Sequence, residues 1–283
     1  MSICYLNGDY LNIEEAKISP LDRGFIFGDA IYEVIACYDK EPFKMGLHID
    51  RLLKNLESIK IDLELSNLKL LNIINEVINK NNSLNQIIYL QISRGPETVR
   101  DHTPQDNSTP TIFISSFPMK VVPKIDIEPI EVIMQDDFRW RKSNIKATSL
   151  LASVMYKMEA KEKNVSEVIL HERGLITEGS VSNIFCVKDK IIKTPPLEAN
   201  ILPGVTRKTL IEIIQKSDYA FTEEDISIDE LFDSDEVWIS NTTKGVVPVS
   251  KIEDHIVLNK QDKSIFKDIL KLFMNEIRSD KSQ

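Results

Sequence analysis

The chain has 283 residues, of which 42% are hydrophobic and 28% charged, which is the composition of a soluble globular protein with room for two domains. Its net charge of −9 disfavours a nucleic-acid-binding role, because such proteins present a dominant basic surface. Three cysteines without CxxC spacing predict neither a disulfide framework nor a zinc site, and no run of residues approaches membrane-spanning length, so we expect a cytoplasmic protein.

The first part of the chain is predicted to form an antiparallel sheet with helices. Strands at 3–6 and 10–13 flank Asn7-Gly8, a pair that tolerates the positive φ of a hairpin turn. A strand at 30–38 is expected to pair with 43–45, and amphipathic helices follow from residue 48 and near 71–78. The next strands, 86–94 and 111–117, enclose a long loop at 95–110, and a loop of that length is usually functional or disordered.

Two prolines bracket a predicted linker at 119–124, which divides the chain into a smaller domain, 1–118, and a larger one, 125–283. The larger domain is expected to contain strands at 127–134, 167–171, 182–187, 191–194 and 236–240, with a helix that starts near residue 205. Ser149 is the predicted N-cap of another helix. Its apolar residues recur at helical spacing and should pack on a core: Leu150, Leu151, Val154, Met155 and Met158.

Lys146 lies just ahead of this predicted helix, between Ile145 and Ala147, whereas most lysines of the chain lie in charged surroundings. A lysine held against a core can lose its proton through desolvation and become a nucleophilic amine that forms Schiff bases. Taken alone, the stretch favours an ordinary loop lysine.

Two segments have features of an anion site. The N–H groups at the helix start in residues 203–207 favour a phosphate, and the turn at Thr242 can add a hydroxyl donor. Arg51 could complete such a site, although a helix arginine off the apolar stripe is more often solvated. Glu178 could accept a charged N–H from a heterocycle, although turn carboxylates are usually solvated. No GxGxxG or GxxxxGK[ST] motif is present, and the four histidines lack metal-ligand spacing, so we expect no metal.

Taken together, these segments resemble the branched-chain and D-amino-acid aminotransferase family, the fold-type IV enzymes that use pyridoxal 5'-phosphate. The likeness covers nearly the whole chain, in the order DRGFIFGDAIYE, HIDRL, IYLQISRG, RWRKSNIK, SEVILH, LITEGSVSNIF, ILPGVTR and SNTTKGVVPV. Several motifs in one order are far more specific than any single motif. The resemblance implies a two-domain α+β fold, with an N-terminal antiparallel sheet with helices and a barrel-like α/β C-terminal domain, and a homodimer.

By this resemblance, Lys146 holds the cofactor through a Schiff base and later moves the substrate α-proton as a general acid and base. Glu178 would bond to the ring nitrogen and keep it protonated, so that the ring can act as an electron sink. Arg51 would pair with the phosphate. The other cofactor-binding residues that the resemblance implies are Ser182, Leu202, Val205, Thr206, Asn241 and Thr242.

The long loop favours one branch of the family. Arg100 and His102 resemble the Arg-x-His pair with which D-amino-acid transaminases hold the substrate α-carboxylate, assisted by a tyrosine that matches Tyr32. Because the lysine works on one face of the cofactor, the side that binds the carboxylate decides which enantiomer reacts. We therefore predict ping-pong transamination of D-amino acids, with 2-oxoglutarate or pyruvate as acceptor. The alternatives are an L-branched-chain transaminase, an aminodeoxychorismate lyase, and a non-enzymatic protein that reuses the pocket for binding.

Overall fold

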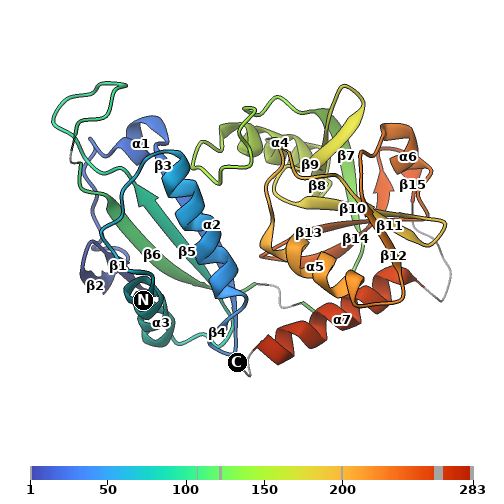
Figure 1. The fold of residues 1–283 in the computed structure, drawn as a ribbon, viewed down its shortest axis with the longest axis horizontal. Helices are drawn as coiled ribbons and strands as arrows, with labels where there is room; N and C mark the ends of the chain where they lie inside the picture. The colour runs from blue at the N-terminus through green and yellow to red at the C-terminus, as the bar shows by residue number, and fades with distance from the viewer. Residues whose placement is uncertain (1, 107, 121–122, 199, 258–263, 281–283) are drawn as a thin grey trace. The chain divides into compact units, whose positions relative to one another are not determined.

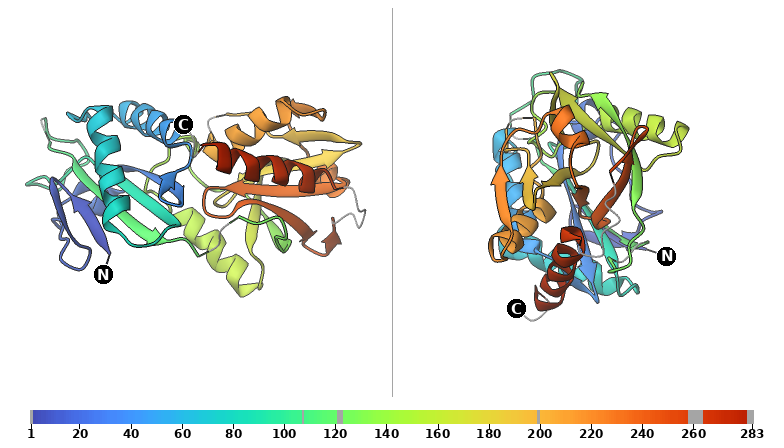
Figure 2. Two further views of the ribbon diagram at one scale, coloured as in Figure 1. Left: turned by 90° about the horizontal axis from the view of Figure 1, so that it is seen from below. Right: turned by 90° about the vertical axis from the view of Figure 1, so that its right-hand side faces the viewer.

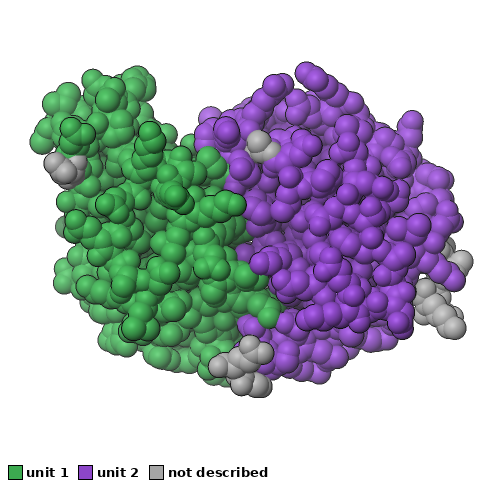
Figure 3. All heavy atoms as spheres, viewed as in Figure 1, with its two compact units in different colours: residues 1–120, 145–149 green, residues 121–144, 150–283 purple. Residues whose placement is uncertain are grey.

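The computed structural model describes residues 2–106, 108–120, 123–198, 200–257 and 264–280 (Figure 1). The chain divides into two compact units, coloured separately in Figure 3. Unit 1 consists of Met1–Lys120 with Ile145–Ser149, and unit 2 of Val121–Asn144 with Leu150–Gln283. Residues 121 and 122 of the predicted linker lie outside the described residues, and the predicted domain limits stay a prediction.

Unit 1 contains a six-stranded sheet of order β2-β1-β6-β5-β3-β4, in which all neighbouring strands are antiparallel. Its strands are β1 (Ile3–Leu6), β2 (Asp9–Asn12), β3 (Ala30–Tyr38), β4 (Glu41–Pro42), β5 (Gln86–Ser93) and β6 (Thr111–Pro118). The predicted hairpin at Asn7-Gly8 is confirmed, and both residues have positive φ. The predicted pairing of residues 43–45 with β3 is shifted: the paired strand starts two residues earlier, and of the predicted residues Phe43 bonds to β3, its N–H donating to the Ala36 carbonyl at 2.8 Å. Asp39 and Lys40 adopt positive φ and form a two-residue turn, so that Glu41–Pro42 pairs with β3.

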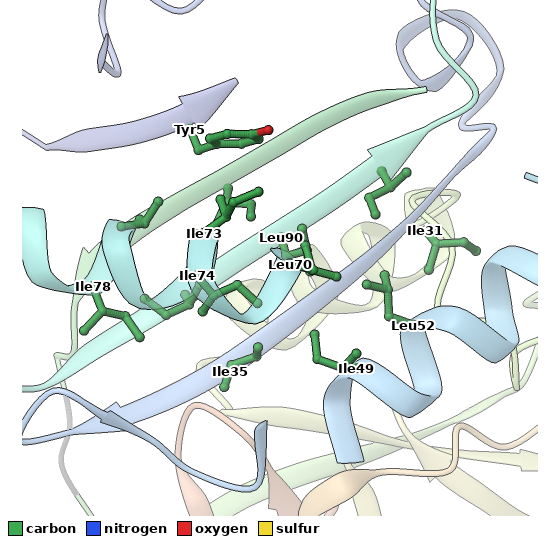
Figure 4. Packing of buried hydrophobic residues seen from close by; sticks show 14 of the residues in the cluster. Tyr5, Ile31, Ile35, Ile49, Leu52, Leu70, Ile73, Ile74, Ile78 and Leu90 are labelled. Atoms are coloured by element: carbon green, nitrogen blue, oxygen red, sulfur yellow. The ribbon is translucent and has the colours of Figure 1, made fainter. Parts of the chain in front are cut away.

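Helices α2 (Met45–Ser58) and α3 (Asn67–Lys80) cover one face of this sheet, as the views in Figure 2 show. Their apolar faces meet side chains from β1, β3, β5 and β6 in one buried cluster (Figure 4). Ile49 and Leu52 of α2 and Ile74 of α3 are buried in it, and full burial of such a side chain stabilises the fold by about 1.5–3 kcal/mol. The predicted helical periodicity therefore identified the core-facing sides of both helices.

The short segment 145–149 extends the sheet of unit 1. Tyr32 N–H donates to the Lys146 carbonyl at 3.0 Å, and Thr148 N–H donates to the Ala30 carbonyl at 3.0 Å. Between these bonds, Ala147 forms a β-bridge with Ile31. The main chain of Lys146 is thus fixed alongside the start of β3 by regular strand-like bonds.

Unit 2 contains a nine-stranded mixed sheet, whose path runs β12-β11-β10-β13-β14-β7-β8-β9, with β15 paired to β14. The strands are β7 (Ile130–Asp136), β8 (Glu167–Glu172), β9 (Leu175–Gly179), β10 (Asn183–Lys188), β11 (Ile191–Thr194), β12 (Ala220–Glu223), β13 (Glu236–Asn241), β14 (Gly245–Ile252) and β15 (His255–Ile256). Strand β9, at one end of this path, also contacts β10. The sheet therefore curls back on itself, and the expected barrel-like character is confirmed.

Among the residues that the structure describes, four helices complete unit 2: α4 (Leu151–Glu162), α5 (Val205–Gln215), α6 (Ile228–Phe232) and α7 (Ile265–Asp280). Alternation along the strands separates two clusters. Ile133 and Val168 pack with α4, whereas Val132 and Ile169 join the larger cluster inside the curled sheet. None of the helices in the described ranges combines the length and apolar character needed to cross a lipid bilayer.

Helix α4 differs from its prediction in two respects. Its N-cap is Leu150 rather than Ser149, and no side chain caps it. Its predicted core face is exposed, because the helix packs on β7 and β8 with its other side, through Tyr156 and Ala160. The Tyr156 hydroxyl fixes this orientation by donating to the Asp136 carbonyl at 2.7 Å. The exposed apolar residues are Leu151, Val154, Met155 and Met158, each 51 to 74% exposed.

Candidate active site

Lys146 is held in a defined position rather than in a solvated loop. Its main chain is bonded to β3 on one side, and the Thr148 hydroxyl donates to the Gly28 carbonyl at 3.1 Å on the other. The half-buried side chain crosses the ring of Tyr32, with Nζ 4.3 Å from the ring centroid. Two of the predicted site residues therefore lie together in unit 1.

Arg51 is buried in unit 1 against β3. Its Nε donates to Glu33 Oε1 at 2.7 Å, and its Nη2 donates to Glu33 Oε2 at 2.8 Å. His48 Nδ1 lies 2.8 Å from the same carboxylate. Because Glu33 follows Tyr32 on β3, the bidentate pair fixes the guanidinium plane close to the strand that carries Tyr32.

The Glu33 carboxylate should contribute strongly to the stability of unit 1. Burial alone would raise the pKa of Glu33, but the hydrogen bonds and charges of Arg51 and His48 lower it from 4.5 to about 2. This stabilisation is therefore present above pH 4.5 and is lost as the pH falls from about 4.5 towards about 2. We expect Glu33→Gln to lower the free energy of unfolding by about 3–5 kcal/mol at neutral pH, because Arg51 is left buried with a neutral partner.

Urea unfolding of the wild type and Glu33→Gln at pH 7 and near pH 3 measures both effects. The difference in the free energy of unfolding between the two proteins should be smaller at the lower pH. The control is Glu76→Gln, which removes an exposed pair with Lys80 and should change stability by less than about 0.5 kcal/mol. An equal difference at both pH values would contradict the conclusion that the ionised Glu33 carboxylate stabilises unit 1.

Arg100 and His102 lie in the loop between β5 and β6, where both residues are exposed. Both contact the ring of Phe27 in the short helix α1 (Arg23–Phe27). The Arg100 Cζ lies 4.8 Å from the Phe27 centroid, and the His102 ring lies 5.3 Å from it. The structure thus brings the predicted pair together on one aromatic side chain.

Glu178, in β9 of unit 2, is buried rather than solvated. It accepts hydrogen bonds from Arg139 Nη1 at 2.5 Å, from Asn183 Nδ2 at 3.0 Å and from Leu202 N–H at 3.1 Å. Arg139 also holds Asp137, through Nε at 2.9 Å and Nη2 at 2.7 Å. One guanidinium therefore serves two carboxylates.

This arrangement leaves the Glu178 site one positive charge short. Burial would raise the pKa of Asp137, but its hydrogen bonds to Arg139 lower it below the ordinary value, so Asp137 is ionised. Burial raises the pKa of Glu178 to about 7, against the opposing effects of Arg139 and the Leu202 N–H. A second cationic N–H next to Glu178 would balance the charge and favour its ionised form.

Asn183 connects Glu178 with the start of helix α5. Its Nδ2 also donates to the Leu202 carbonyl at 3.0 Å. Gly204, the N-cap of α5, packs so closely that a Cβ there would lie 2.1 Å from Asn183 Oδ1. No side chain caps the helix, and its first residues are the buried Val205 and Thr206. The helix start, where N–H groups and the dipole favour an anion, is thus fixed relative to Glu178.

The turn after β13 is anchored to the same region of unit 2. Asn183 is the register partner of Ser240, and α5 packs against β13. Asn241 ends β13 and Thr242 opens the turn to β14, which Asn241 Oδ1 stabilises by accepting from the Lys244 N–H at 2.9 Å. Both predicted residues therefore follow directly after a strand position that is paired with Asn183.

Ser182 lies in a neighbouring cluster. Its hydroxyl donates to Glu167 Oε2 at 3.1 Å, and the Ser180 hydroxyl donates to Oε1 of the same buried carboxylate. The hydroxyl of Ser182 thus bonds to Glu167 and not to Glu178. Its expected role towards a cofactor stays a prediction.

Several residues that hold Arg51 in unit 1 and Glu178 in unit 2 were not predicted from the sequence. Arg139 and Asn183 lie inside quoted motifs, RWRKSNIK and LITEGSVSNIF, yet no role was predicted for either. Asn183 offered a signal, as a polar residue at the start of the strand-like stretch NIFCV, whereas RWRKSNIK is mostly polar and offered none for Arg139. Glu33 gave this kind of signal, as a polar residue inside the strand-like stretch AIYEVIACY, but its partners Arg51 and His48 come from a different element and could not be read from it.

Comparison with known proteins identifies the family. Residues 30–252 match the family described as amino-transferase class IV. D-alanine aminotransferases of Staphylococcus epidermidis and Bacillus licheniformis are 34% and 33% identical over 286 and 274 residues, covering 99% and 97% of this chain and 99% and 96% of the relatives. The branched-chain amino acid aminotransferase of Escherichia coli has a TM-score of 0.89 at 25% identity, covering 97% of this chain and 94% of that chain. The chain therefore belongs to the class IV aminotransferase family.

Proposed function

We propose that this chain is a pyridoxal 5'-phosphate-dependent D-amino-acid transaminase, with 2-oxoglutarate or pyruvate as the acceptor. The observation that carries the proposal is its similarity, over nearly its whole length, to enzymes named D-alanine aminotransferases. The paired Arg100 and His102 on Phe27 support the same choice. We place the enzyme in the cytoplasm, as the cysteine spacing predicts.

The residues of unit 2 fit this cofactor. The site around Glu178 is one positive charge short, and a protonated pyridine nitrogen would supply that charge. The start of α5, which no side chain caps, suits a phosphate. When bound, the cofactor supplies an aldehyde that condenses with amines and a ring that withdraws electrons from the substrate α-carbon. Glu178 holds the ring nitrogen, and Asn183 and Leu202 keep its carboxylate in place.

The remaining roles are those that the resemblance to the family implies. Lys146 Nζ would hold the cofactor through its aldehyde and would take the substrate α-proton as a general base. Arg51 neutralises the phosphate, with donors from Val205, Thr206 and Thr242. Tyr32, Arg100 and His102 bind the substrate α-carboxylate. Ser182, Leu202 and Asn241 complete the proposed cofactor contacts.

We also propose that the enzyme is a homodimer, with loops of one subunit closing the site of the other. The exposed apolar face of α4 supports this: Leu151, Val154, Met155 and Met158 follow one another along one helix. An apolar patch of this kind usually marks a surface that another protein covers, and self-association is the commonest such contact. Static light scattering of the purified enzyme measures the oligomeric state directly.

The half-reaction with single amino acids tests the function. Purified enzyme with bound cofactor is mixed with D-alanine, D-glutamate or L-leucine, and the loss of the visible absorption band is followed. We expect the D-amino acids to react at least about 100-fold faster than L-leucine, because the carboxylate site selects the enantiomer. Turnover of L-leucine alone would instead identify a branched-chain transaminase. Pyruvate released from aminodeoxychorismate without an acceptor would identify a lyase, and a preparation without the visible band would indicate a binding protein.

A further inference from the structure

Arg23 in helix α1 is a buried arginine for which the transamination chemistry has no use. The residue is 4% exposed, and its Nε pairs with Asp29 at 2.9 Å. Its other donors reach into the loop between β5 and β6. Nη1 donates to the Asp101 carbonyl at 2.7 Å and to Glu97 at 2.9 Å, and Nη2 donates to the His102 carbonyl at 3.0 Å. A single guanidinium thus holds three points of one loop.

These contacts surround the proposed carboxylate-binding pair. Asp101 lies between Arg100 and His102, and Arg23 donates to main-chain carbonyls there. These bonds therefore do not use the side chains of Arg100 and His102. The ring of Phe27, one turn further along α1, contacts the side chains of Arg23, Arg100 and His102. The Arg23 Cζ lies 4.7 Å from its ring centroid, close to the 4.8 Å of Arg100. Helix α1 therefore provides both the main-chain anchor and the aromatic support.

Glu97 extends the anchor to the far side of the loop. While Oε2 accepts from Arg23, Oε1 accepts from the Gln105 N–H at 2.8 Å and from the Ser108 hydroxyl at 3.0 Å. Glu97 is 7% exposed, so these hydrogen bonds are shielded from water. Loss of Arg23 would release both the tip of the loop and the carboxylate that closes its base.

We propose that Arg23 is a positioning residue for the substrate, which fixes the main chain at residues 100–102 so that Arg100 and His102 meet the α-carboxylate. The inference rests on the proposed D-amino-acid specificity. Arginine suits the task because its planar fork offers five donors in fixed directions, whereas a lysine offers one mobile ammonium. Small displacements of a binding group weaken substrate positioning strongly.

The test compares Arg23→Lys with Arg94→Lys in the enzyme with bound cofactor. Arg94 is a matched control, because it pairs with the same Asp29 at 2.7 and 3.0 Å but donates its other bonds to the carbonyls of Ile59 and Lys60. We expect Arg23→Lys to raise KM for D-alanine and for pyruvate at least about 10-fold, with kcat changed less than about threefold and the cofactor spectrum unchanged. Arg94→Lys should leave KM within about twofold.

Hydrogen exchange gives a readout that does not depend on turnover. Amides of residues 98–106 should exchange faster in Arg23→Lys than in the wild type, and at the wild-type rate in Arg94→Lys. If Arg23→Lys does not fold, Phe27→Leu removes the aromatic support without leaving a buried charge, and the same KM increase is expected. Unchanged KM and unchanged exchange in whichever variant folds overturn the inference.

Failure of the inference can be separated from failure of the proposed function. If the wild type prefers D-amino acids and Arg100→Lys raises KM while Arg23→Lys does not, the function stands and the role of Arg23 is refuted. If the wild type prefers L-amino acids, the proposed function fails, and the substrate role of Arg23 fails with it. In that case exchange of residues 98–106 shows only whether Arg23 orders the loop.

Discussion

Replacing Lys146 with alanine is expected to lower the transamination rate at least about 10⁴-fold. Proton transfer by a positioned side chain contributes about 10²–10⁴-fold, and the variant also loses the covalent attachment of the cofactor. The fold should be retained, because the bonds that tie residue 146 to β3 use its main chain rather than its side chain. Initial rates with D-alanine and 2-oxoglutarate measure the loss. Mass spectrometry after borohydride reduction should show the cofactor adduct on Lys146 of the wild type and none on the variant.

Lys161→Ala is the matched control for this substitution. Lys161 is an exposed lysine in the last turn of α4, and we expect its removal to leave the rate within about twofold and the adduct in place. An adduct found on another lysine of the Lys146→Ala protein, with activity within tenfold of wild type, would refute the role of Lys146.

The strands of this fold were largely predictable because their signals are local. β3 and β11 have the predicted bounds, and the hairpin turn between β1 and β2 follows from the conformational freedom of Asn-Gly. Helix α1 was missed because five residues are too few for a periodic pattern. Its start depends on the Asp22 side chain, which accepts from the Gly24 N–H at 2.8 Å, and its end on Gly28 with φ 66°.

Helix α4 shows the limit of periodicity. The pattern located the helix and its apolar face correctly, but it could not say what covers that face. Within this chain, the helix packs through Tyr156 and Ala160, and the apolar stripe stays exposed. A surface intended for another subunit and a surface intended for the core have the same sequence pattern, so only the tertiary structure separates them.

Motifs predicted the residues of the candidate site, but not the distant polar partners that hold them. Arg51 and Glu178 each read in isolation as a solvated charge, yet both are buried. Their burial is possible because Glu33 lies opposite Arg51 and Arg139 lies opposite Glu178, from segments 18 and 39 residues away. Such pairings arise when strands and helices pack, and no local pattern of residue types encodes them.

Replacing Glu178 with glutamine is expected to lower kcat about 10²–10³-fold, the usual effect of removing one preorganised electrostatic partner. The amide has nearly the same shape and keeps an acceptor for the Leu202 N–H, but it cannot balance a protonated ring nitrogen. Arg139 remains paired with Asp137, so the variant should fold. Without the carboxylate, a bound ring would lose the proton on its nitrogen more easily and would withdraw electrons less strongly.

Two measurements check this prediction. Single-turnover rates with D-alanine report the chemical step, with Glu172→Gln as the control, because that carboxylate pairs with the exposed Arg141. Unfolding of the cofactor-free protein reports the pKa of Glu178, which burial raises from 4.5 to about 7. Because the folded chain binds this proton more tightly, the contribution of Glu178 to stability is present below pH 4.5 and is lost as the pH rises through about 7. Glu178→Gln should remove this fall in stability with rising pH. A variant with both the wild-type rate and the wild-type pH dependence of stability would show that Glu178 neither titrates in this range nor serves the ring nitrogen.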